Sequence, residues 1–148
     1  MMRNKLLRHA AITAVCASVL GMAAPMPALA WTAWNRHKVN DLGQGVFEVV
    51  GRVGSGPQQY WCGAGDYVRR ALGMPAAQRV YIWRPLGPSA SQPGKKAVQF
   101  ALSPPKGAST EVGLSLSVAR AGDNLSASMA QSYCHTSDFD ERPPRLRP

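Results

Sequence analysis

The first thirty residues limit what the chain can fold into, because their composition is that of a segment removed during export. The first nine residues carry three basic side chains and no acidic one, and residues 10–25 form an uncharged, mainly apolar run. Ala28 and Ala30 place small side chains at the two positions that a signal peptidase recognises. This order predicts a cleaved signal peptide over residues 1–30, so that the folded chain begins at Trp31.

The apolar run is too short for a transmembrane helix, which needs about 20 residues. We therefore expect a mature chain without a transmembrane segment, exported by a bacterium to the periplasm or secreted. Export also bears on the cysteines, because disulfides form and persist outside the reducing cytosol.

Two cysteines remain after residue 30, Cys62 and Cys134, and they allow only one pairing. We predict a disulfide between them. The bridge would close a long loop, and the chain-entropy model credits such a closure with about 4 kcal/mol of stability. That is a large part of the roughly 5–15 kcal/mol that stabilises a whole domain.

Sequence periodicity predicts one small α+β domain over residues 31–137, built on a mainly antiparallel four-stranded sheet. A helical stripe of apolar side chains over residues 57–72 predicts the main helix, which would cover one face of the sheet. The Pro-rich residues 138–148 are expected to form a flexible tail. Alternation predicts strands at 46–53, 79–84, 97–102 and 111–119, the last three as an antiparallel meander, after an extended lead-in over 31–43.

Residues 125–134 fit either a short helix or a strand. We favour a helix capped by Ser126, because Ala, Met and Gln are good helix formers. The predicted disulfide would fasten this helix to the main one. Gly63 and Gly65 weaken the main helix, and we expect them to allow close approach of a neighbouring backbone.

The position of Cys62 near the start of the main helix raises a catalytic alternative. A helix N-terminus favours a thiolate, so the chain could be a small cysteine amidase or peptidase of cell-wall peptides. Such an enzyme needs an imidazole base, but His37 lies in the irregular lead-in and His135 at the edge of the tail. The cysteines and histidines also lack the paired spacing of zinc sites. We therefore expect no catalytic residue, no metal and no cofactor.

Aromatic residues alternate on one face of the expected strand 79–84. If that face is exposed, Tyr81, Trp83 and Arg84 form a platform for a sugar or a partner protein. If Trp31 and Trp34 fold over it, the rings form a minor core, and we favour this second arrangement.

The charge of the exported chain indicates a class of partner. Removal of residues 1–30 leaves 14 basic and 8 acidic residues, with no dense basic run. Export argues against nucleic acid, and an excess of basic residues gives either solubility or attraction to anionic surfaces. We expect a non-enzymatic binding, accessory or envelope-associated protein, whose partner is an envelope protein or an anionic envelope surface.

Overall fold

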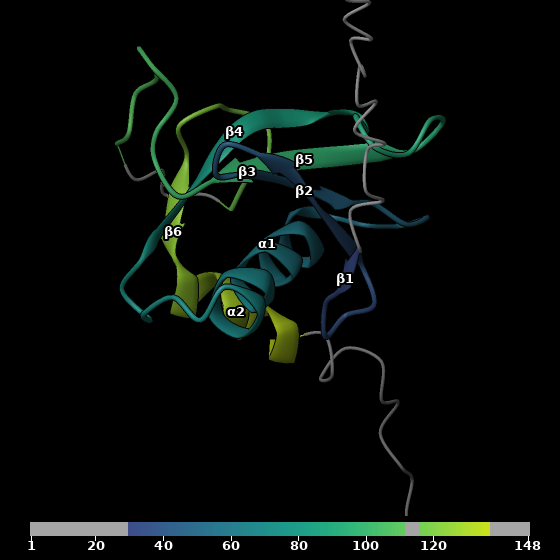
Figure 1. The fold of residues 1–148 in the computed structure, drawn as a ribbon, viewed down its shortest axis with the longest axis horizontal. Coiled ribbons are helices and arrows are strands. Elements are labelled where there is room, and N and C mark those ends of the chain that lie inside the picture. Colours follow the sequence, from purple (N-terminus) through teal and green to yellow (C-terminus); the bar gives the residue numbers. More distant parts are fainter. Residues whose placement is uncertain (1–29, 112–115, 137–148) are drawn as a thin grey trace, which may run out of the picture.

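The computed structural model describes residues 30–111 and 116–136, which form a curled antiparallel sheet with helices on one side (Figure 1). The strand order across the sheet is β1-β2-β3-β5-β4-β6, and every neighbouring pair is antiparallel. The strands are β1 (Trp31–Thr32), β2 (Lys38–Gly43), β3 (Val46–Val50), β4 (Arg79–Pro88), β5 (Lys96–Ala101) and β6 (Asn124–Ser126). The helical elements are α1 (Pro57–Asp66), the π-helical turn η1 (Tyr67–Ala71) and α2 (Ala127–Thr136).

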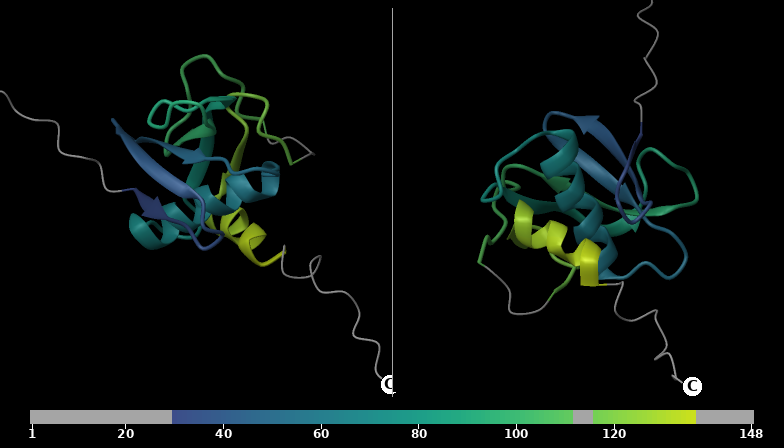
Figure 2. Two further views of the ribbon diagram at one scale, coloured as in Figure 1. Left: turned by 90° about the vertical axis from the view of Figure 1, so that its right-hand side faces the viewer. Right: turned by 90° about the horizontal axis from the view of Figure 1, so that it is seen from below.

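The hydrophobic core lies between the sheet and the helices, which cross the same face of the sheet (Figure 2). Because side chains alternate along a strand, β3 directs Phe47 and Val49 towards the helices, and β5 adds Val98 and Phe100 to the same layer. Trp61 of α1 packs edge-on against Phe100, with ring centroids 5.0 Å apart. These side chains are almost completely buried, so the helix-facing layer is the apolar side of the sheet.

The main helix begins where the sequence predicts. Pro57 stands at the first helical position, and the side chain of Gln59 accepts a hydrogen bond from the Gly56 N–H (2.9 Å). Pro suits this position because its missing N–H has no partner in the first turn. Gly73, with φ of +64°, lies just past the end of the helix in the left-handed conformation that glycine favours. The predicted 57–72 helix is confirmed, but its last turn, η1, is π-helical.

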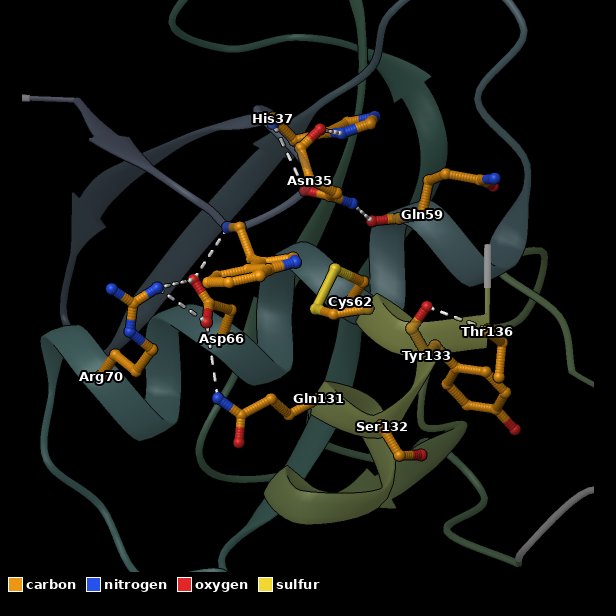
Figure 3. Close-up of a disulfide and its surroundings, with 12 residues drawn as sticks. Asn35, His37, Gln59, Cys62, Asp66, Arg70, Gln131, Ser132, Tyr133 and Thr136 are labelled. Atoms are coloured by element: carbon orange, nitrogen blue, oxygen red, sulfur yellow. Dashed lines mark hydrogen bonds and ion pairs between the residues drawn. A yellow bond between two sulfur atoms is a disulfide. The ribbon is translucent and has the colours of Figure 1, made fainter. Parts of the chain in front are cut away.

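The two helices meet at Gly65 of α1. A Cβ at this position would lie 2.6 Å from the carbonyl carbon of Ala130 in α2, so the approach requires glycine. Less than one turn earlier, Cys62 is bonded to Cys134 of α2, with Cα atoms 4.8 Å apart (Figure 3). The predicted disulfide and the close approach at Gly65 are both confirmed. Gly63, by contrast, faces the sheet.

The helix expected near the C-terminus is also confirmed. α2 follows directly after β6, and the hydroxyl of Ser126 accepts a hydrogen bond from the Met129 N–H (3.3 Å), as a cap does. α1 and α2 have ten residues each. Among residues 30–111 and 116–136, no helix combines the length and the apolar character needed to cross a membrane.

The prediction of a four-stranded sheet is wrong, because the sheet has six strands and one of the expected strands is not among them. The expected lead-in over residues 31–43 supplies β1 and β2, and β6 adds the far edge. Of the expected strand 111–119, residues 112–115 lie outside the described part, and residues 116–119 form no strand. The backbone of 116–119 bonds elsewhere: Val118 accepts from the Leu86 N–H (3.0 Å) and Ser117 from the indole of Trp61 (3.0 Å). The edge beside β4 is therefore taken by β6, and β5 pairs with β3.

Replacing both cysteines by alanine should lower the free energy of unfolding by about 2–5 kcal/mol, because the cross-link no longer restricts the unfolded chain. Urea unfolding followed by circular dichroism measures this loss. A reductant should destabilise the wild-type protein by a similar amount and leave the Cys62→Ala, Cys134→Ala variant unchanged. A wild-type unfolding curve that does not change on addition of reductant would contradict the presence of the Cys62–Cys134 disulfide.

Candidate anion-binding pocket

A pocket of about 220 Å³ opens where β2 begins and β3 ends. Lys38 and Val50 pair across these strands, and alternation places Val50 on the sheet face opposite the helices, called here the outer face. Four exposed basic side chains line the pocket, and no acidic residue does among the described residues. We call it the basic pocket; its lining is Arg36, Lys38, Val50, Gly51, Arg52, Gln92 and Lys95.

The first wall is a tight turn ahead of β2. The Arg36 N–H donates to the carbonyl of Ala33 (2.8 Å), and Arg36 has a φ of +64°. A residue with a Cβ is unusual in this conformation, which costs of the order of 1 kcal/mol or more. Asn or Gly would fit the turn with less strain. The turn therefore keeps a guanidinium at the pocket although the backbone disfavours it.

The second wall is the loop between β3 and α1, and His37 joins it to the first. His37 is buried, and its Nε2 lies 2.7 Å from the hydroxyl of Ser55. Its Nδ1 lies 3.3 Å from the carbonyl oxygen of Asn35, which can only accept, so the proton is on Nδ1 and Ser55 donates to Nε2. Ser55 also accepts from the Arg52 N–H (2.9 Å). These hydrogen bonds fix the backbone at Arg52, and so the direction in which its side chain points.

The environment of His37 keeps its imidazole neutral. Burial lowers the pKa of His37, the Asn35 carbonyl raises it, and the nearby positive charge of Arg52 lowers it again, with a net pKa below 6.5. Because protonation is disfavoured, the ring acts as a fixed connector between the two walls at neutral pH.

The third wall is the turn between β4 and β5, which is held by the buried carboxylate of Glu48 in β3. Glu48 accepts hydrogen bonds from the hydroxyl of Ser89 (2.6 Å), from the backbone N–H groups of Ala90 and Ser91 (both 2.9 Å) and from the hydroxyl of Ser91. Asn40 of β2 donates to the same Ser91 hydroxyl (2.7 Å). Gln92 and Lys95, which line the pocket, continue this turn.

Glu48 remains ionised in this setting. Burial raises the pKa of the Glu48 carboxyl, but the hydrogen bonds from Ser89, Ser91 and Ala90 outweigh burial and bring the pKa below 4.5. A buried carboxylate is tolerated only where donors of this kind surround it. Glu48 thus anchors the turn that carries Lys95.

The sequence alone does not predict the basic pocket. Its four basic residues come from three separate segments of the chain, and no sequence motif connects them. The segments meet only through the pairing of β2 with β3 and of β4 with β5.

Cys62 and Cys134 lie away from the basic pocket, on the helix side. Their neighbour in α1, Asp66, is buried and accepts from Arg70 (3.3 Å) and from Gln131 of α2 (3.4 Å) (Figure 3). It also accepts from the backbone N–H of Trp34 (3.0 Å), which ties the chain ahead of β2 to both helices. The cysteines therefore belong to a structural junction.

The histidines considered as catalytic or metal ligands are separated by their surroundings. His37 is hydrogen-bonded to Ser55, whereas His135 is exposed on α2 with its ring 6.1 Å from that of Trp34. In the part of the chain that the structure describes, no three His, Cys, Asp or Glu side chains lie close enough to share a metal ion.

The prediction that Trp31 and Trp34 fold over Tyr81 to form a minor core is wrong. Trp31 packs against the helix-side core with the Arg70 guanidinium 5.7 Å from its ring, and Trp34 lies beside His135, so neither covers strand β4. Trp83 is 38 % exposed.

The proposed platform residues are rearranged by a bulge in β4. Tyr81 pairs with Ala101 and Arg84 with Gln99, so these two residues share the outer face although they are three positions apart. Trp83 falls in the bulge, without a partner on β5. Whether Tyr81, Trp83 and Arg84 bind a ligand stays a prediction.

The predicted cleavage site falls at the edge of the described chain. Ala28 lies outside it, and Ala30 is exposed just ahead of β1.

Comparison with known proteins identifies no relative: no protein-family model matches the chain, and neither a curated protein nor a solved structure is significantly similar to it. No activity is transferred to the chain from another protein.

Acidification should destabilise the protein in two steps. Because the pKa of His37 is lower in the folded state than its ordinary 6.5, unfolding takes up a proton below about pH 6.5, and stability falls as pH drops towards the folded pKa. Glu48 stabilises the fold above its ordinary pKa of 4.5, and this contribution is lost as pH falls through its lower folded pKa.

Urea unfolding at about pH 7.5 and 5.5 measures the first step, whose slope from one group is at most about 1.4 kcal/mol per pH unit. His37→Gln should reduce the difference between the two pH values. An unchanged difference in that variant would show that His37 does not titrate in this range.

Proposed function

We propose that this chain is an exported, non-enzymatic binding protein that recognises an anionic group of the bacterial envelope in the basic pocket. The observation that carries the proposal is the convergence of four cationic side chains on one pocket of about 220 Å³. Among the described residues that line it, no carboxylate offsets these charges. A cluster of one sign in a concave surface focuses the field and concentrates counter-ions.

The donors in the pocket suit an oxyanion such as a phosphate group. Two of the four basic residues are arginines, Arg36 and Arg52, whose guanidinium groups can give paired hydrogen bonds to phosphate or carboxylate. Lys95 and Lys38 add point charges, although the Lys38 ammonium also donates to the Thr32 hydroxyl (2.7 Å). Phosphorylated lipids and polymers are anionic ligands that an exported protein meets in the envelope.

Binding rather than catalysis is supported by the state of the sulfur atoms. A nucleophilic cysteine must be a thiolate, whereas Cys62 is bonded to Cys134 and buried. The alternative of a cysteine amidase would require this bridge to open, which would also release the α1–α2 junction. The structure therefore favours no second function.

Export is supported by two independent features. The N-terminal thirty residues have the order of charges, apolar residues and small residues of a signal peptide. The intramolecular disulfide suits an oxidising compartment such as the periplasm or the extracellular medium.

Vesicle sedimentation tests the proposed binding. The protein should bind vesicles that contain phosphatidylglycerol and not vesicles of phosphatidylcholine alone, and high salt should release it because screening weakens the contact. Arg52→Gln should weaken binding by about fivefold, since each basic residue at an anionic surface contributes about 1 kcal/mol.

Lys106→Gln is the matched control, because Lys106 is exposed, lies outside the basic pocket and carries the same charge. It should change the affinity by less than a factor of about two. Equal losses of vesicle affinity in the two variants would indicate attraction to the whole protein surface and contradict the pocket. Vesicle binding that salt does not weaken would contradict an electrostatic site.

A further inference from the structure

A second hollow, of about 250 Å³, lies at the opposite end of the β2–β3 hairpin. The hairpin contributes Asp41, Val46 and Phe47, the turn η1 and the residue after it contribute Tyr67 and Leu72, and Leu102 follows β5. We call it the Tyr67 pocket. It shares no residue with the basic pocket, so the two sites can be tested separately.

The walls of the Tyr67 pocket are mainly apolar. The rings of Phe47 and Tyr67 pack together with centroids 4.8 Å apart, and both are almost completely buried. Leu102 is half-buried and Leu72 is exposed, so the hollow has an aromatic base and an aliphatic rim. A dry cavity of about 150 Å³ holds a benzene molecule, so this hollow has room for one ring and a short substituent.

The hydroxyl of Tyr67 makes no hydrogen bond within the described part of the fold. The Tyr67 side chain is only 8 % exposed, yet its hydroxyl has no hydrogen-bond partner among the described residues. Burial raises the pKa of Tyr67, and the negative charge of Asp41 raises it further, so the phenol keeps its proton. The hydroxyl still has contact with solvent, so it is free to bond a polar atom of a ligand that enters the hollow.

Asp41 gives the hollow its charge. Its Oδ1 accepts from the Gly43 N–H (2.8 Å), but no ion pair joins Asp41 to a basic side chain within the described residues. No basic residue lines the pocket, although the chain as a whole has a net charge of +9. The Tyr67 pocket is thus an acidic site on a basic protein, and it favours a cation.

The backbone at Tyr67 is also unusual. Tyr67 begins the π-helical turn, whose wide ring is closed by the hydrogen bond from the Leu72 N–H to the Tyr67 carbonyl (3.0 Å). Such turns are rare and occur frequently at functional sites. Here the turn connects the two residues that bring the phenol and the aliphatic rim to the hollow.

We propose that the Tyr67 pocket binds a small organic cation with an apolar body, such as an aryl-alkyl ammonium ion. The ammonium group pairs with Asp41 and donates to the Tyr67 hydroxyl, and the aromatic faces of Tyr67 and Phe47 add attraction for the positive charge. The apolar body fills the space between Phe47, Leu72 and Leu102.

Titration calorimetry at neutral pH tests this site with phenethylammonium and with 2-phenylethanol, a neutral molecule of similar shape. The wild-type protein should bind the cation at least tenfold more tightly than the alcohol. Asp41→Asn should abolish this preference, because the amide oxygen keeps the bond to Gly43 while the charge is lost. Tyr67→Phe should weaken binding of the cation more than binding of the alcohol.

Glu111→Gln is the matched control, since it removes the same charge from an exposed residue outside the pocket. It should leave the preference for the cation unchanged. Equal affinities for the two probes, no saturable binding, or an Asp41→Asn variant that keeps the preference would overturn the proposal. Thermal unfolding of each variant shows that the fold is retained.

Discussion

A buried carboxylate without a cationic partner holds the outer face of this protein together. Glu48 is enclosed by the turn between β4 and β5, and within the described residues only hydroxyl and N–H donors surround it. Removing an ionised carboxylate from water without such donors would be strongly unfavourable, so the turn must close over the strand for Glu48 to stay charged. The position of Lys95, and with it the third wall of the basic pocket, depends on this closure.

The sheet therefore separates two kinds of stabilisation. Its helix side is apolar, and there the disulfide and the glycine contact at Gly65 hold α1 and α2 together. Its outer side carries a row of polar residues, in which Asn40, Glu48 and Gln99 stand opposite one another on β2, β3 and β5. The β2–β3 hairpin connects a basic site at one end with an acidic, apolar site at the other.

The sequence predicts the elements that depend on a local residue pattern, and it predicts the disulfide from the number of cysteines. The main helix, the C-terminal helix with its Ser126 cap and the Cys62–Cys134 bridge are confirmed, because helical periodicity, capping and cysteine count are visible without tertiary contacts. The sequence does not predict strand β2, because its alternation is short and is interrupted at the turn. The sequence feature that marks this hairpin is the Gly43-Gln44-Gly45 segment, where all three residues have positive φ.

Neither pocket could be predicted from the chain alone. The basic pocket requires the register that pairs Lys38 with Val50 and the turn that brings Lys95 beside them. The bulge at Trp83 likewise moves Arg84 onto the face of Tyr81, against the simple alternation. Registers and bulges are set by tertiary packing, which a single sequence does not display.

The most direct test of this account is the affinity of Glu48→Gln for vesicles that contain phosphatidylglycerol, measured on protein whose circular dichroism confirms the native fold. The substitution removes a negative charge, so electrostatics alone would strengthen binding of an anion. If Glu48 positions the wall that carries Lys95, binding should instead weaken, because the amide presents N–H groups to hydroxyl and backbone donors and the turn loosens. Unchanged or stronger binding would contradict the account.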